Sequence, residues 1–436
     1  MSRRRDLTPA RPVPHITGSA EPRHDEPGDP TMSSPQPCRR ECKPPRARGA
    51  HLEPGAVVAS ATEAAQSGAP YVTRPVAYDA VLLSGFGGPE GPEEVMPFLR
   101  NVTRGRGIPD ERLEEVAHHY LAFGGASPIN QQNRELRDRL AAALAASGID
   151  LPVYWGNRNW APYLDETLAQ AARDGVHRML AIATSAYSSY SSCRQYREDW
   201  ADALEITGLQ DVLQIDKVRQ FFSHPGFVQP FIDGVRDGLE AAEQAGHARS
   251  EIEVLFTTHS IPSADAALSG AGQFDGAAGG AYVAQHLAVA DHVMAQAAPD
   301  VAWQLVYQSR SGSPSVPWLG PDINEAIEAL RGRTAVLIVP SGFVSDHLEV
   351  LWDLDREACQ TARDAGLWVT RTPTPGTCPA FVEALVDLVR ERLTGTPVAQ
   401  RANVTSVGPW FDVCRRGCCT KSTTPTPGPA IAGLVP

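Results

Sequence analysis

The feature that most constrains the fold of this chain is a repeated alternation of short apolar segments with longer helix-like ones. Strands are predicted in two series, at 78–86, 151–156, 178–184 and 216–221, and then at 251–258, 302–309, 334–340 and 367–370. Helices are predicted between and after them, at 111–122, 131–146, 163–173, 196–204, 228–244, 281–298, 322–330, 347–365 and 379–393. Strands separated by helices form parallel βαβ units with right-handed crossovers.

The two series predict an α/β fold with two similar lobes, at 76–224 and 225–395, each a parallel sheet flanked by helices. Residues 1–75 are rich in Pro, Arg, Ser and Ala and show no apolar period, so we expect a disordered tail or an over-extended gene start. Residues 396–436 form a Cys-bearing C-terminal extension, unstructured from Thr420 onward. Ligands of open α/β sheets bind at the carboxyl ends of the strands, which is where a site is expected.

The charge balance excludes one class of partner. The chain has 39 Lys and Arg against 51 Asp and Glu, a net charge of -12, whereas nucleic-acid binding needs clustered cations. The sequence contains no run of about 18 apolar residues, and its basic start lacks the apolar region of a secretory signal. We therefore expect a cytoplasmic, monomeric protein without a transmembrane segment. In that compartment its eight Cys favour metal binding or reactivity over disulfides.

Ionisable residues gather where two predicted strands end. The strand 251–258 runs into His259, and the strand 334–340 runs into a segment that carries Asp346, His347, Glu349, Asp353 and Glu357. These strand ends share one edge, so we expect His259 to approach Glu349. A neutral imidazole that faces a carboxylate forms a proton relay or a divalent metal site. The alternative is a capping histidine beside a solvated helix face.

The acidic residues of this segment have a helical spacing. Glu349, Asp353 and Glu357 fall at i, i+4 and i+8, so they are expected to lie along one helix face. Like charges at this spacing disfavour a helix, which makes a stripe of them costly as a purely structural feature. A row of carboxylates suits the passage of a hydrated cation.

Five sequence blocks resemble the ferrochelatase family, whose members insert Fe(II) into a porphyrin. In chain order they read GFGGPEGPEEV, FGGASPIN, TTHSIP, YQSRSGSPSVPWLGP and VPSGFVSDHLEVLWDLD, and the similarity spans residues 78–395. The resemblance implies a chelatase fold of two flavodoxin-like lobes with the porphyrin clamped between them. The block YSSYSSCRQYRE and the Cys-bearing C-terminus are most similar to actinobacterial members. Those members act on coproporphyrin III, which gives coprohaem III, rather than on protoporphyrin IX.

The resemblance implies a division of roles at the metal site, with Fe2+ as substrate. His259 would accept a pyrrole proton or ligate the incoming iron, and Glu349 would face it as metal ligand and proton relay. Asp346 and His347 would set the tautomer and charge of this pair. Asp353 and Glu357 would hand on the hydrated ion. Zn(II) and Co(II) would bind to the same pair, since affinity order alone does not select iron.

Substrate contacts are implied at further positions. The positions that match the family's porphyrin contacts are Ser127, Tyr196, Tyr120, Arg104 and Arg106. Arg158 is a further partner for a propionate through its bidentate guanidinium. Trp318 either walls the ring or packs in the core. Phe86 stands where some family members carry a Tyr as axial iron ligand, and a phenyl ring cannot coordinate.

The cysteines imply a second group. Cys193 lies in the first lobe, and three more lie near the end of the chain as VCRRGCC, namely Cys414, Cys418 and Cys419. This set is similar to the [2Fe-2S] ligands of cluster-bearing ferrochelatases, and four thiolates are the usual ligands of such a cluster. Cys378 or Cys359 is an alternative for one position. The role of the [2Fe-2S] cluster would be structural or sensory, because metal insertion transfers no electrons. The pair Cys38 and Cys42 in the tail we interpret as coincidence.

Other functions stay open at this point. A ferrochelatase for protoporphyrin IX fits the same residues, because both porphyrins carry propionates. A chelatase that inserts Co or Ni into another tetrapyrrole typically presents two His at the metal site, whereas this chain pairs His259 with Glu349. A non-catalytic porphyrin carrier would not need the acidic stripe.

Overall fold

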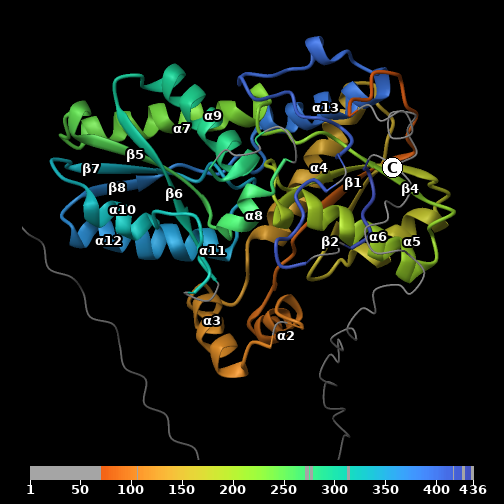
Figure 1. Cartoon of the computed structure of the whole chain (residues 1–436), viewed down its shortest axis with the longest axis horizontal. Helices are drawn as coiled ribbons and strands as arrows, with labels where there is room; N and C mark the ends of the chain where they lie inside the picture. The colour runs from red at the N-terminus through yellow and green to blue at the C-terminus, as the bar shows by residue number, and fades with distance from the viewer. Residues whose placement is uncertain are drawn as a thin grey trace, which may run out of the picture. The chain divides into compact units, whose positions relative to one another are not determined.

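The computed structural model describes residues 70–433 except 106, 271–273, 275–277, 312–314, 416 and 425–427 (Figure 1). Two parallel four-stranded sheets are present in this part of the chain, with strand orders β2-β1-β3-β4 and β6-β5-β7-β8. The strands are β1 (Ala80–Gly85), β2 (Val153–Asn157), β3 (Arg178–Ala183), β4 (Gln214–Lys217), β5 (Ile252–His259), β6 (Ala302–Gln308), β7 (Ala335–Val339) and β8 (Trp368–Arg371). The predicted α/β class is confirmed.

Helices join the strands in the expected order. They are α2 (Pro92–Val102), α3 (Asp110–Ala122), α4 (Ile129–Ala146), α5 (Leu164–Arg173), η1 (Tyr190–Arg194), α6 (Gln195–Thr207), α7 (Pro225–Gln244), η2 (Arg249–Glu251), α8 (Ser263–Ala267), α9 (Gly280–Ala297), α10 (Ile323–Ala329), α11 (Leu348–Val350), η3 (Leu351–Ala358), α12 (Cys359–Asp364), α13 (Pro379–Thr394) and η4 (Val398–Gln400). Some of the helices begin or end with typical capping residues. The side chains of Asp322 and Glu325 form a capping box at the start of α10, and α6 and α13 end at left-handed Gly208 and Gly395.

Alternate residues of each strand pack against helices on opposite faces of the sheet. In β1, Val81 and Leu83 pack in the apolar cluster that contains residues of α4 and α13, whereas Ala80 and Leu82 pack with residues of α5 and α6. In the second sheet, helices α7 and α9 lie on one face and α10 and α12 on the other, as Figure 1 shows. Both faces are therefore buried, as parallel sheets require.

Three sequence predictions about secondary structure are wrong in detail. The strand predicted at 216–221 ends at Lys217, because Phe221 and Phe222 are buried as core residues of a loop rather than of the sheet. Helix α2 was not predicted, although Pro92 occupies the first turn, where proline is tolerated. The helix predicted over 347–365 changes to π-helical winding at Leu351–Ala358 before it resumes as α12. The i, i+4 spacing predicts a helix but does not distinguish these two windings.

The segments next to the termini are more ordered than we expected. Residues 1–69, with Cys38 and Cys42, lie outside the described residues. Residues 70–75, which we assigned to a disordered tail, pack instead: Val72 is buried and its backbone N–H donates to Asp412 at 2.8 Å. The prediction that the chain is unstructured from Thr420 is also wrong. Ile431 is 1% exposed in the cluster that contains β1 and α6, and its N–H donates to the carbonyl of Arg197 at 3.2 Å. Apolar burial holds this segment, which local composition does not reveal.

Candidate active site

Two neighbouring strands of the second sheet bring His259 and Glu349 together. His259 is the last residue of β5, and β7, which pairs with β5, leads through a loop into α11, whose first turn contains Glu349. The Nε2 atom of His259 lies 3.7 Å from Oε2 of Glu349, and the two side chains are 34% and 54% exposed. An imidazole and a carboxylate that both reach solvent form a pair open to an incoming ion or proton.

The surroundings of His259 fix its tautomer. Its Nδ1 lies 2.5 Å from the carbonyl oxygen of Ser260, which can only accept a hydrogen bond, so Nδ1 carries the proton. In the neutral ring Nε2 then has a free lone pair that points towards Glu349. The backbone of His259 is held in turn, because the hydroxyl of Tyr282 donates to its carbonyl at 2.8 Å and lies 2.7 Å from Oγ1 of Thr258.

Asp353, one turn further along, is held by the end of a third strand. The hydroxyl of Ser309 donates to Oδ2 of Asp353, and Nε2 of Gln308 donates to the same oxygen at 3.3 Å. Ser309 follows β6 with φ of 59°, a left-handed conformation that is costly for a residue with a Cβ. Burial raises the pKa of Asp353 to about 7, and the negative charge of Glu349 adds to this shift. Asp353 therefore changes its charge near neutral pH.

Arg371 at the end of β8 links the loop before the site to the π-helical segment. Its guanidinium contacts both carboxylate oxygens of Asp346, at 3.1 and 3.3 Å, and both of Asp355, at 2.5 and 3.0 Å. The backbone N–H of Asp346 donates to Gln132 of α4 at 3.0 Å. Burial lowers the pKa of the adjacent His347, which favours its neutral form. Sequence reasoning missed Arg371, although it ends a strand at the same sheet edge as His259.

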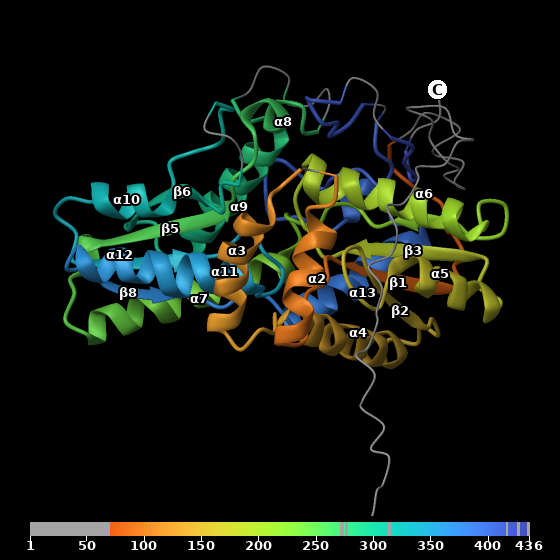
Figure 2. The same cartoon turned by 90° about the horizontal axis from the view of Figure 1, so that it is seen from below.

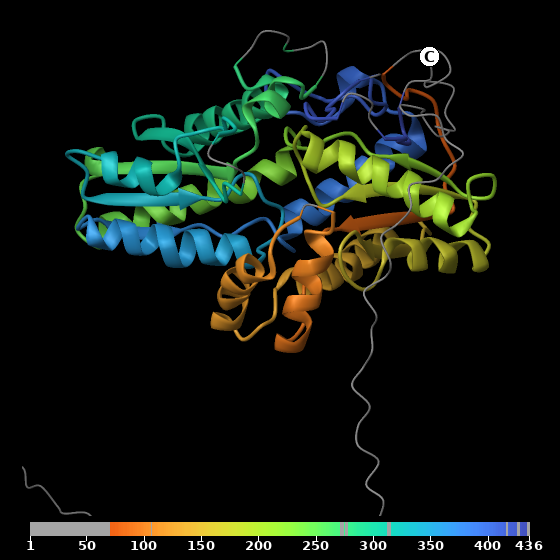
Figure 3. The ribbon, with the colours of Figure 1, turned by 60° about the horizontal axis from the view of Figure 1, so that its bottom comes forward.

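Helices α2 and α3 form a hairpin that packs against the site. Figure 2 shows α3 beside α11 with α2 next to α3, and Figure 3 shows the two orange helices side by side. Tyr120 of α3 shares an apolar cluster with Leu348. Burial and the nearby charge of Glu349 raise the pKa of the Tyr120 hydroxyl. A second contact joins α3 to η3, where the rings of His119 and Trp352 stack with centroids 3.8 Å apart. Trp352 Nε1 also donates to Glu357 at 2.7 Å.

Comparison with known proteins identifies the family. The ferrochelatase family model matches residues 78–393. The chain belongs to the ferrochelatase family. A coproporphyrin III ferrochelatase of Leifsonia xyli subsp. xyli is 59% identical over 387 residues, covering 86% of this chain and 99% of the relative. One from Tropheryma whipplei (strain Twist) is 56% identical over 363 residues, covering 82% and 93%. A protein named ferrochelatase from Rhodopirellula baltica is 46% identical over 359 residues, covering 82% and 97%.

The residues predicted to contact the porphyrin differ in accessibility. Ser127 and Tyr196 are 7% and 5% exposed. Arg158 forms an ion pair with Asp199 and stacks over the Tyr196 ring at 4.2 Å, so it would have to exchange partners to bind a propionate. Arg104 is partly exposed in the turn after α2, and Arg106 lies outside the described residues. Trp318 is partly buried, and its Nε1 has no hydrogen-bond partner among the described residues.

The four predicted cluster cysteines meet in the core, although Cys193 and Cys419 are 226 residues apart in sequence. Their sulfurs lie 3.7 Å apart, and those of Cys418 and Cys419 lie 3.6 Å apart. Cys414 completes the set through hydrogen bonds with Cys193 and Cys418, which lower the pKa of its thiol well below the usual value. Cys359 packs in a separate apolar cluster, and Cys378 precedes α13.

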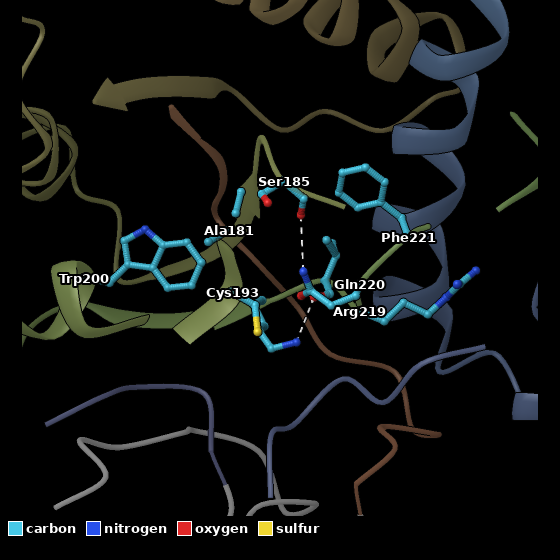
Figure 4. Close-up of a pocket in the computed structure, with 10 residues that line it drawn as sticks. Ala181, Ser185, Cys193, Trp200, Arg219, Gln220 and Phe221 are labelled. Atoms are coloured by element: carbon cyan, nitrogen blue, oxygen red, sulfur yellow. Dashed lines mark hydrogen bonds between the residues drawn. The ribbon is translucent and has the colours of Figure 1, made fainter. Parts of the chain in front are cut away.

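A small cavity lies beside these thiols. It has room for about one water molecule, and the residues that line it include Cys193, Trp200, Lys217 and Gln220 (Figure 4). It is far too small for a porphyrin and is separate from the His259 and Glu349 pair. Over the described ranges, no three His, Cys, Asp or Glu side chains are arranged to hold an ion. No helix in those ranges is long and apolar enough to cross a membrane.

Proposed function

We propose that this protein inserts Fe2+ into coproporphyrin III and thereby forms coprohaem III in haem biosynthesis. The observation that carries the reaction is the His259 and Glu349 pair, 3.7 Å apart at the carboxyl edge of the second sheet. The porphyrin follows from the relatives, because those at 59% and 56% identity are named coproporphyrin III ferrochelatases.

The chemistry requires a base at the ring nitrogens. A free porphyrin carries two pyrrole N–H protons, and both must leave as the dication enters. The lone pair on Nε2 of His259 is free to accept a proton, because Nδ1 carries the other one. Glu349 then stabilises the imidazolium and, at 54% exposed, passes a proton to solvent. The charge balances: Fe2+ replaces two protons, which leave through these two residues.

Asp353 and Glu357 extend the acidic path away from this pair. Asp353 is held by Ser309 and Gln308, and the charges of Glu349 and Glu357 both act on it. Carboxylate oxygens at successive turns bind a hydrated ferrous ion through its water shell before it loses water at His259. We propose that the ion travels from Glu357 through Asp353 to Glu349.

The propionates of the porphyrin need cationic partners at the rim of the site. Arg104 supplies one such group at the end of α2, and Arg106 is proposed as a second. The exposed apolar side chains Phe86, Leu121 and Phe123 give the macrocycle an apolar surface, and Phe123 already contacts Trp352 of η3. Tyr120, Ser127, Tyr196, Arg158 and Trp318 complete the proposed contacts.

We also propose a [2Fe-2S] cluster on Cys193, Cys414, Cys418 and Cys419. The donor set fits: four buried sulfurs make a closed ring of contacts, and two of these contacts measure 3.6 and 3.7 Å. Each iron of such a cluster takes two thiolates, and two sulfurs bound at about 2.3 Å to one tetrahedral metal lie about 3.8 Å apart, so this spacing suits one pair on one iron. Binding requires deprotonation and a small separation of the thiols. The group would hold the C-terminal segment on η1, and it takes no part in proton transfer at His259.

The test of the reaction is Glu349→Gln. We expect iron insertion into coproporphyrin III to fall at least about 100-fold, while binding of the porphyrin, followed by its fluorescence, stays near wild type. The control is Glu328→Gln, the same change at an exposed position on α10. Turnover with protoporphyrin IX is measured in parallel, and equal turnover of both porphyrins would contradict the proposed substrate. Retained insertion in Glu349→Gln would contradict the role of Glu349.

A further inference from the structure

Two buried cationic side chains beside the cysteines have no carboxylate partner among the residues that the structure describes. Lys217 is 3% exposed, and its ammonium group makes one hydrogen bond, to the carbonyl of Val218 at 3.2 Å. Arg197 is 1% exposed; its Nε donates to the carbonyl of Ile431 at 2.6 Å, and its Nη1 has no hydrogen-bond partner within the described part of the chain. Among the residues that the structure describes, no carboxylate forms an ion pair with either side chain.

Other buried cations in the same region are paired. Arg194 lies in η1, four residues after Tyr190, and contacts Glu198 at 2.8 Å. Arg219 lies two residues after Lys217 and contacts Glu391 at 2.8 Å. Arg401 contacts Asp412 at 2.8 Å. Burial of an unpaired charge is costly enough that proteins normally avoid it or supply a partner. The two cations therefore indicate a negative charge that no carboxylate of the described residues provides.

Both side chains are positioned to meet such a charge at the four thiols. Lys217 and Cys193 line the same cavity, where Figure 4 labels Cys193. Arg197 lies one turn after Cys193 and holds Ile431, while the N–H of Cys414 donates to the carbonyl of Ala432 at 3.1 Å. Lys217 and Arg197 both act electrostatically on Cys414, and both favour its thiolate.

We propose that Lys217 and Arg197 are the counter-charges of a metal–thiolate centre at the four cysteines, and that they set its retention and its reduction potential. The proposal rests on the proposed cluster. Four thiolates around a [2Fe-2S] core, or around one divalent ion, carry about two negative charges in excess. Two buried cations neutralise that excess, whereas without the centre they are left as unpaired charges.

The experiment compares wild type with Lys217→Met, Lys217→Arg and Lys421→Met, each purified anaerobically as the full chain. Iron, sulfide and zinc content, the reduction potential, the rate of metal loss to a chelator, and the melting temperature with and without the centre are measured. Lys421 is the matched control, because it is exposed and two residues from Cys419.

In Lys217→Met we expect retention of the centre to weaken about 10- to 100-fold and the reduction potential to fall. The metal-free protein should melt higher than metal-free wild type, because an unpaired charge is gone. Lys217→Arg should stay near wild type.

The outcomes separate the two proposals. Wild type without metal or sulfide contradicts the cluster, and the counter-charge role fails with it. Metal-loaded wild type together with an unchanged potential and retention in Lys217→Met overturns the counter-charge role alone. A melting temperature that falls equally in the loaded and metal-free Lys217→Met protein also overturns it, since that pattern marks a side chain needed only for packing. Zinc in place of iron and sulfide excludes the [2Fe-2S] assignment. In that case faster loss of zinc to the chelator from Lys217→Met than from wild type supports the counter-charge role, and equal rates overturn it.

Discussion

Asp353 differs from its two acidic neighbours in its surroundings. Glu349 and Glu357 reach solvent, whereas Asp353 turns towards the end of β6 and accepts hydrogen bonds from Ser309 and Gln308. The pKa of about 7, which results first from burial, means that this carboxyl alternates between neutral and ionised forms in the physiological range. Only the ionised form attracts an incoming cation.

Asp353→Asn tests this titration. Iron insertion by wild type should rise as pH increases through about 7, because Asp353 then gains its negative charge. The variant should be slower above pH 7 and should lose this rise, while Glu357→Gln keeps it. The measurement is the pH profile of insertion at limiting Fe2+, and a wild-type profile retained in Asp353→Asn would count against the assignment.

The raised pKa of Asp353 also determines how its contribution to the free energy of unfolding changes with pH. The pKa of Asp353 is raised from 3.8 to about 7 on folding, so between these values the folded state binds more protons than the unfolded state. The contribution of Asp353 to the free energy of unfolding therefore falls as pH rises through this window and is flat above it. In Asp353→Asn the free energy of unfolding should not show this decrease with pH. Urea unfolding of both proteins at pH 5 and pH 8 measures the difference.

At this scale the sequence predicted the principal pair but not its supports. His259 and Glu349 each follow a strand, so parallel topology alone brings them to one edge. Ser309 and Gln308 also end a strand, yet their contact with Asp353 depends on the left-handed turn at Ser309. No residue pattern indicates that conformation for a serine. Arg371 was missed because its partners, Asp346 and Asp355, lie on separate elements.

At the scale of elements, η3 is held by a side chain from outside itself. The π-helical winding leaves poorer backbone geometry than an α-helix and often marks a functional site. Here the Arg371 guanidinium joins Asp355 within η3 to Asp346 before α11, and Arg371 is 12% exposed. Helical periodicity predicted the length of the segment, but the i, i+4 pattern contains no information about this external restraint.

Arg371→Gln is expected to destabilise the protein by about 3 kcal/mol or more, because two partly buried carboxylates lose their shared cation. Iron insertion should fall as well, since η3 contains Asp353 and Glu357 of the proposed acidic path. The measurement is chemical denaturation together with turnover, and Arg356→Gln, a change at an exposed position of η3, provides the comparison. Equal stability of the two variants would argue against a restraint by Arg371.

Across the whole molecule, Asp412 joins segments that are far apart in sequence. Its carboxylate is 1% exposed, accepts the N–H of Val72 and the guanidinium of Arg401, each at 2.8 Å, and lies 3.9 Å from Arg392 of α13. Helix α13 packs in turn on α4 and α7, so this cluster connects elements that flank both sheets. One buried acid therefore ties the start of the folded chain to its end.

Asp412→Asn should cost about 3 kcal/mol or more, because Arg401 and Arg392 then remain buried without this anion. The free energy of unfolding and the rate of proteolysis in the C-terminal segment both report the change. Asp300→Asn removes an acid from a surface ion pair with Arg249 and should have no measurable effect. Identical unfolding curves for the two variants would exclude the proposed link.

The sheets were predictable and the terminal segments were not, for one physical reason. The local periodicity of apolar residues indicates strands and helices, and the strands β1 to β8 follow one another as this periodicity predicts. Val72 and Ile431 are single apolar residues in polar, Pro-rich surroundings, and their burial depends on partners more than 200 residues away.

The distance between Cys193 and Cys419, 226 residues along the chain, governs when their site can form. A ribosome releases the chain from its N-terminus at about 5–20 residues per second, so Cys193 must wait for the 226 residues up to Cys419 before all its partners emerge. Contacts of such long range close late and slowly. The four-thiol site is thus among the last parts of the molecule to assemble, and only a chain synthesised through Cys419 can complete it.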